Sequence, residues 1–197
     1  MKYDYQVFFE EKLREVAKEP RVVDIGGGEP FQKDLARYRE IFQHVRFETV
    51  DPDAASHPTH VGSIYQLPFR DNELPAILCK SVFEHLAEPH RAAEELYRVL
   101  QPGGKLLLYT HFIYPYHARV GVYGDYFRYT EEGLRFLFRR FSQVVVRKQG
   151  GIFRAFINFI PGLRYIRPLA EPLAYALDRI LGEQRTTTPG FYIFAVK

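Results

Sequence analysis

The sequence predicts an α/β fold: a doubly wound, mainly parallel sheet in a Rossmann-like arrangement. Short apolar segments alternate with stretches of helical apolar spacing along most of the chain, and the first apolar segment ends in three consecutive glycines. Apolar and charged residues make up 46% and 26% of the 197 residues, which is typical of one globular domain. We therefore expect a single domain over residues 1–197, with an antiparallel last strand.

The first half of the chain predicts strand–helix–strand units. Val22 to Ile25 is β-branched and is followed by the glycines, and the strand after it is ended by Pro52, because proline cannot extend a ladder. Pro89 suits the first turn of a helix, and Gly103 and Gly104 favour a turn. The predicted elements are a strand at 22–25, a helix at 31–42, strands at 45–50 and 74–79, a helix at 89–100 and a strand at 105–110.

The second half adds two strands and a helical insertion. Thr130 is predicted to cap a helix whose first turn holds Glu131 and Glu132. Strands are expected at 144–147 and 191–196, and residues 151–188 between them carry two amphipathic helical patterns. This insertion is predicted to cover its own domain as a lid; binding a partner or resting on an anionic membrane are the alternatives.

Composition restricts the compartment and the partners. Cys79 is the only cysteine, and no Cys/His group has the spacing of a structural zinc site, so no metal is predicted. The opening residues are too charged for a signal peptide, so a cytoplasmic protein is expected, with peripheral membrane contact as the alternative. Residues 133–170 hold Arg and Lys but no Asp or Glu, which is either a solvated surface, the favoured interpretation, or a surface for an anionic ligand. No motif indicates nucleic acid.

The glycine turn predicts a nucleoside site. Gly26, Gly27 and Gly28 follow the first predicted strand, and Asp51 ends the second, 25 residues after Gly26. In such folds the ligand lies beyond the carboxyl ends of the strands, and an acidic side chain at this distance accepts hydrogen bonds from ribose hydroxyls. The third glycine of the dinucleotide fingerprint would fall at Phe31, which disfavours a NAD-dependent oxidoreductase.

Four ordered motifs resemble the small class I S-adenosylmethionine-dependent methyltransferases often called type 11. They are residues 62–72, which contain Leu67-Pro68-Phe69, residues 76–79, residues 83–86, which contain Glu84-His85, and residues 95–104, which contain Arg98-Val99-Leu100-Gln101-Pro102-Gly103-Gly104. The turn with its Pro30-Phe31, and the run Asp125-Tyr126-Phe127-Arg128-Tyr129-Thr130 after His117, are similar to a branch of glycan and polysaccharide biosynthesis, although the turn lacks one residue and the gap after His117 is longer.

The resemblance implies a sheet of seven strands and S-adenosyl-L-methionine as the cofactor, and it assigns residues to the cofactor. Asp24 and the three glycines would surround its methionine part, and Asp51 would hold the ribose. Ser63 and Ile64 would flank the adenine, although many relatives have an acidic residue at the position of Ser63. Ser81 would approach the sulfonium end.

Methyl transfer to a hydroxyl also requires loss of a proton. His111 and His117 follow the strand at 105–110, on the expected acceptor side, and Asp125 is placed to orient one of them. A structural role is the alternative for either histidine. The tyrosines of this region suit a glycan-like or other small acceptor, anionic or lipid-linked, and equally suit ordinary packing.

The function expected from these features is methyl transfer to an oxygen or nitrogen of such an acceptor. The alternative is a non-catalytic module of the same fold that binds a partner or membrane through residues 151–188. The sequence does not indicate an oligomeric state.

Overall fold

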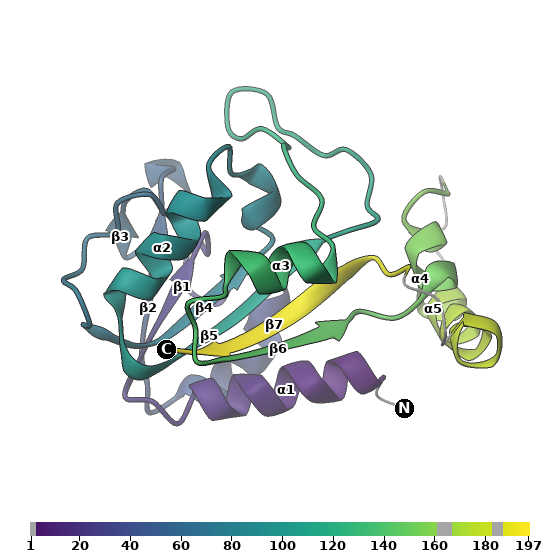
Figure 1. Cartoon of the computed structure of the whole chain (residues 1–197), viewed down its shortest axis with the longest axis horizontal. Coiled ribbons are helices and arrows are strands. Elements are labelled where there is room, and N and C mark those ends of the chain that lie inside the picture. Colours follow the sequence, from purple (N-terminus) through teal and green to yellow (C-terminus); the bar gives the residue numbers. More distant parts are fainter. Residues whose placement is uncertain (1–2, 161–166, 183–186) are drawn as a thin grey trace.

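A computed structural model describes residues 3–160, 167–182 and 187–197, so residues 161–166 and 183–186 of the predicted insertion lie outside the described part. Seven strands form one sheet in the order β3-β2-β1-β4-β5-β7-β6, which confirms the predicted fold class (Figure 1). The pairs from β3 to β5 are parallel, and β7 runs antiparallel to both β5 and β6. The strands are β1 Arg21–Ile25, β2 Arg46–Asp51, β3 His60–Val61, β4 Leu74–Lys80, β5 Leu100–His111, β6 Gln143–Lys148 and β7 Gly190–Val196.

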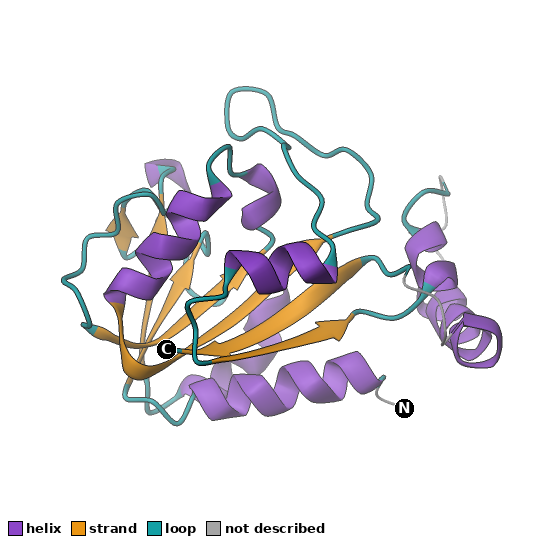
Figure 2. Ribbon diagram, in the orientation of Figure 1, coloured by secondary structure: helices purple, strands orange, loops and turns teal. Residues whose placement is uncertain are grey.

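Helices cover both faces of the sheet (Figure 2). The helix α1 (Asp4–Val16) packs on one face together with η1 (Lys33–Phe42), and α2 (Pro89–Val99) and α3 (Glu131–Leu137) pack on the other. Alternate strand residues point to opposite sides: Val22 and Leu78 belong to the core beneath α1, and Val23 and Ile77 to the core beneath α2. The central strands are therefore buried on both faces, which fixes their carboxyl ends as one rigid edge.

Several element predictions need correction. The segment predicted as a helix at 31–42 is a 3-10 helix over Lys33–Phe42, in which Leu35, Tyr38 and Ile41 recur every third residue, as that geometry requires. The glycines at 103 and 104 lie inside the long strand β5 instead of in a separate turn. Neither α1 nor the two-residue strand β3 was predicted. Thr130 caps α3 as predicted, since its hydroxyl accepts from the Gly133 amide at 3.1 Å.

The insertion between β6 and β7 forms α4 (Ile152–Ile157), α5 (Arg167–Leu177) and the π-helical turn η5 (Asp178–Gly182). These helices lie beyond the end of the sheet, on the far side from β3 (Figure 1). Arg154 is buried there and pairs with Glu171 at 2.8 Å, so the basic run of residues 133–170 is not entirely a solvated surface. None of the described helices is both long and apolar enough to cross a membrane.

Candidate functional site

The carboxyl ends of β1, β2, β4 and β5 border a cavity of about 670 Å³. The strand order reverses between β1 and β4, which is where open α/β sheets bind ligands. The cavity joins the glycine turn at one end to a group of histidines at the other. Its lining residues fall into three groups: Ile25, Gly26, Val50, Asp51, Pro52 and Asp53; Gly62, Ser63, Ile64, Tyr65, Ser81 and Val82; and His85, Leu86, His111, His117, Gly121, Val122 and Tyr123.

The glycine turn leaves no room for side chains. Gly26 has φ +77° and donates to the Val50 carbonyl at 2.7 Å, and a Cβ on it would lie 2.4 Å from Cγ2 of Val82. A Cβ on Gly27 would lie 2.4 Å from Oδ2 of Asp24. Burial raises the pKa of Asp24 to about 7, against the opposing effect of Lys80. The backbone of β1 can therefore approach a ligand closely, with Asp24 packed behind it.

The predicted ribose and adenine residues lie along the same wall. Asp51 ends β2, and its Oδ1 accepts from the Asp53 amide at 2.9 Å. Ser63 and Ile64 follow β3, and the Ser63 hydroxyl accepts from the Tyr65 amide at 3.2 Å. Ser81, directly after β4, has φ +55°, a left-handed conformation that is costly for a residue with a side chain.

The histidine end of the cavity is held by the loop between β5 and α3. Nδ1 of His117 lies 3.0 Å from the Pro115 carbonyl and 3.3 Å from Oδ2 of Asp125. Asp125 also accepts from the His117 amide at 2.8 Å and pairs with Arg128, which holds the pKa of that carboxyl well below its usual range. His117 is thus held by Pro115 and Asp125, which are not among the residues that line the cavity.

Glu84 is the main site residue that sequence reasoning missed. It is fully buried, Oε2 accepts from the Thr110 hydroxyl at 2.9 Å, and Oε1 has no hydrogen-bond partner. Burial raises the pKa of Glu84 to about 7. Nε2 of His111 lies 3.3 Å from Oε1, and burial lowers the pKa of His111 to about 3. The Glu84-His85 motif is the signal that the sequence offers, but the sequence analysis assigned no catalytic or binding role to Glu84.

The structure brings most of the predicted site residues to this one cavity. Gly26, Asp51, Ser63, Ile64, Ser81, His111 and His117 line it. Asp24 lies behind the turn and Asp125 behind His117, and Gly27 and Gly28 continue the turn without lining the cavity. Of the described residues of the insertion, none lines the cavity.

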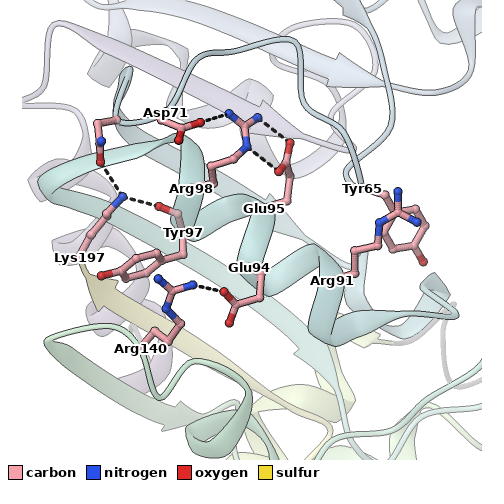
Figure 3. Close-up of a pocket in the computed structure, with 10 residues that line it drawn as sticks. Tyr65, Asp71, Arg91, Glu94, Glu95, Tyr97, Arg98, Arg140 and Lys197 are labelled. Carbon is pink, nitrogen blue, oxygen red and sulfur yellow. Dashed lines mark hydrogen bonds and ion pairs between the residues drawn. The ribbon is translucent and has the colours of Figure 1, made fainter.

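A second cavity, of about 460 Å³, lies against α2 and is lined by charged side chains that already pair with one another (Figure 3). Arg98 pairs with Asp71 and Glu95 at 2.7 Å, and Arg140 pairs with Glu94. Lys197 donates to the Asn72 amide oxygen and the Tyr97 carbonyl, both at 2.7 Å. Arg98 and Arg140 are thus already paired with carboxylates and need no bound ligand to balance their charge.

Comparisons with known proteins relate the first half of the chain to methyltransferases. Residues 24–108 match a family model described as a methyltransferase domain. An uncharacterized methyltransferase of Mycolicibacterium gilvum is 34% identical over 108 residues, which are 48% of this chain and 41% of that protein. A malonyl-[acyl-carrier protein] O-methyltransferase of Coxiella burnetii is 36% identical over 92 residues, 45% of this chain and 33% of the relative. The matches thus cover less than half the length of these relatives.

Solved structures show the same fold over nearly the whole chain. Phosphoethanolamine N-methyltransferase 2 of Haemonchus contortus, in complex with S-adenosyl-L-methionine, superposes with a TM-score of 0.63 at 13% identity, covering 97% of this chain and 52% of that one. An S-adenosylmethionine-dependent methyltransferase from Archaeoglobus fulgidus gives a TM-score of 0.63 at 14% identity, covering 97% and 92%. At these identities the likeness concerns the fold.

Proposed function

We propose, from the methyltransferase domain that this chain contains, that it transfers a methyl group from S-adenosyl-L-methionine to an oxygen or nitrogen of a small or glycan-like acceptor. The observation that carries the proposal is the continuous cavity between the glycine turn with Asp51 and the histidine cluster. One end has the features of a nucleoside site, and the other offers groups that can activate a polar acceptor.

The residues present fit the cofactor. The side-chain-free turn at Gly26 accommodates its methionine part, Asp51 accepts from its ribose hydroxyls, and Ile64 offers an apolar surface to its adenine. Ser63 takes part in the adenine contact as a weaker acceptor than a carboxylate. When bound, the cofactor supplies a methyl group made electrophilic by its sulfonium. Ser81 lines the same cavity as the histidines.

The acceptor is held at the histidine end. His111 and His117 activate its reacting atom, and Asp125 positions His117 through the amide and Nδ1 contacts described above. Tyr123 and Val122 give this end an aromatic and apolar wall, suitable for the face of a sugar or another small ring. Placing donor and acceptor in one cavity supplies the alignment that an in-line displacement needs.

We also propose that the insertion contacts a membrane surface, where a lipid-linked acceptor would reside. Large apolar side chains of α5 and η5 are exposed there, with Leu169 at 77%, Leu173 at 63% and Ile180 at 76%. The alternative, a non-catalytic module of this fold, would keep the membrane contact without using the cavity. Cofactor binding distinguishes the enzyme, which requires it, from such a module, which does not.

The test of the cofactor site is S-adenosylhomocysteine binding, measured by thermal shift and calorimetry. We expect a rise in Tm for the wild type and a loss of affinity of roughly 10- to 100-fold for Asp51→Ala, because about 1.5–3 kcal/mol is lost with each charge-assisted hydrogen bond. Asp71→Ala, which removes a carboxylate from the ion pairs of the second cavity, should bind as the wild type does. Absence of binding by the wild type at millimolar ligand would overturn the proposal.

A further inference from the structure

Glu84, His85 and His117 offer three metal-ligating atoms that lie within 4.8 Å of one another at the acceptor end of the cavity. Glu84 and His85 are adjacent in the turn η3 (Phe83–His85), and His117 comes from the loop 32 residues later. Nε2 of His117 lies 4.0 Å from Oε1 of Glu84, and the rings of His85 and His117 have centroids 4.8 Å apart.

Backbone carbonyls fix the protonation of both imidazoles. Nδ1 of His85 lies 2.6 Å from the Gly124 carbonyl, and Nδ1 of His117 lies 3.0 Å from the Pro115 carbonyl. A carbonyl only accepts, so in each ring Nδ1 must donate its hydrogen. The neutral ring then has a lone pair on Nε2, the form in which histidine binds metals with a second-shell partner on its other nitrogen.

The Glu84 carboxylate has one oxygen, Oε1, that accepts no hydrogen bond. Glu84 is buried, its Oε2 is taken by the Thr110 hydroxyl, and Oε1 is without a hydrogen-bond partner. A buried carboxylate oxygen without a donor is costly, and such a group calls for an explanation. A cation bound by Oε1 and the two Nε2 lone pairs would supply the missing partner of Oε1.

The loop that carries His117 is tied to the turn that carries the other two ligands. The Tyr126 and Phe127 amides donate to the Glu84 carbonyl at 2.8 and 3.2 Å. Arg128 binds the Tyr114 and Pro115 carbonyls at 3.2 and 3.0 Å and pairs with Asp125. Hydrogen bonds therefore hold the loop with His117 against the turn with Glu84 and His85, and Arg128 braces the loop itself.

We propose that Glu84, His85 and His117 bind a divalent first-row transition metal ion such as Zn²⁺. Two imidazoles and one carboxylate suit these ions, and imidazole disfavours Mg²⁺ and Ca²⁺. Because His85 and His117 line the cavity, a cation held by them would lie at its acceptor end. This inference rests on the proposed function. A cation at this site would lower the pKa of an acceptor hydroxyl bound to it, so that the hydroxyl would lose its proton to water more readily.

The test is calorimetric titration of untagged protein with Zn²⁺, together with the visible absorption of the Co²⁺ form. We expect a stoichiometry of one and a Co²⁺ spectrum typical of nitrogen and oxygen ligands. Glu84→Gln and His117→Asn should each weaken Zn²⁺ binding at least about tenfold, and Asp125→Asn, which acts through His117, should weaken it about as much. His44→Asn, an exposed histidine outside the cluster, should leave binding unchanged.

Measuring S-adenosylhomocysteine binding and Zn²⁺ binding on the same variants distinguishes failure of the metal site from failure of the proposed function. Asp51→Ala should bind S-adenosylhomocysteine more weakly and keep Zn²⁺ binding. Glu84→Gln should keep S-adenosylhomocysteine binding, which also shows that this variant is folded. Zn²⁺ binding that is absent from the wild type, or unchanged in both Glu84→Gln and His117→Asn, would overturn the metal site. In that outcome Oε1 of Glu84 shares a proton with Nε2 of His111 instead.

Discussion

Gly26 and Gly103 have nearly the same φ angle but differ in the space around a Cβ atom. Comparing substitutions at the two positions therefore distinguishes the cost of backbone strain from the cost of a steric clash. Gly26 has φ +77° and Gly103 has φ +76°, so a side chain is strained at either position. A Cβ at Gly26 would meet Val82 at 2.4 Å, whereas nothing lies within 4 Å of a Cβ at Gly103. Gly103→Ala thus serves as a matched control for Gly26→Ala.

We expect Gly103→Ala to lower the free energy of unfolding by about 1–2 kcal/mol, the cost of a left-handed residue with a side chain. Gly26→Ala should cost roughly a further 1–3 kcal/mol through overpacking against Val82, and it should abolish S-adenosylhomocysteine binding. Urea denaturation and thermal shift measure the two effects. Equal destabilisation by the two substitutions would show that Val82 moves aside at no cost.

A site residue could be predicted from the sequence when it directly follows a strand, and could not when a long loop brings it to the site. The glycine turn and Asp51 could be placed from sequence, because each directly follows a strand and the carboxyl ends of parallel strands share one edge of the sheet. The cluster of Glu84, His85 and His117 could not, because only the path of the loop brings His117 back over η3. Sequence spacing carries no information about such a return.

Among the helices and strands, those with a clear apolar period and a buried face could be predicted. Very short elements, and elements whose apolar spacing fits two geometries, could not. The strands β1, β2 and β4 and the helix α2 have apolar patterns that their burial confirms. The strand β3 has only two residues, too few for any periodicity. The segment Lys33–Phe42 has apolar spacing that fits α-helical and 3-10 geometry about equally, so its buried residues alone did not decide between them.

The insertion shows an interaction between elements that sequence could not indicate. Asp178, in η5, acts as the cap of α4: Oδ2 accepts from the Gly151 amide at 2.8 Å and Oδ1 from the Phe153 amide at 2.9 Å. The Arg154 amide also donates to Oδ2, at 3.3 Å. The start of α4 is therefore held by a residue from the other end of the insertion.

We expect Asp178→Ala to destabilise this subregion by about 1–3 kcal/mol, because buried backbone amides lose their acceptor. Hydrogen exchange at residues 151–157 should accelerate while S-adenosylhomocysteine binding stays intact. Asp34→Ala, an exposed carboxylate 3.5 Å from Lys80, should change stability by less than about 0.5 kcal/mol. Loss of ligand binding in Asp178→Ala would mean that the insertion is coupled to the cavity.

At the scale of the whole molecule, the cavity and the exposed face of the insertion belong to separate parts of the fold. The histidine end of the cavity is bordered by the loop between β5 and α3, which rises above the sheet, whereas α4 and α5 lie past the ends of β6 and β7 (Figure 1). A membrane contact at the insertion would thus hold the domain at a surface without closing the cavity. The two activities should be separable by substitution.

We expect the double variant Leu169→Glu, Leu173→Glu to lose association with vesicles of phosphatidylglycerol and phosphatidylcholine in a sedimentation assay, because the two carboxylates prevent burial of that face in the lipid interface. Its S-adenosylhomocysteine binding should equal that of the wild type. Phe136→Glu, which places one carboxylate at a 59% exposed apolar residue of α3, should still sediment with vesicles. A wild type that stays in solution with every vesicle would exclude the membrane contact and leave a protein partner as the alternative for the exposed apolar side chains of the insertion.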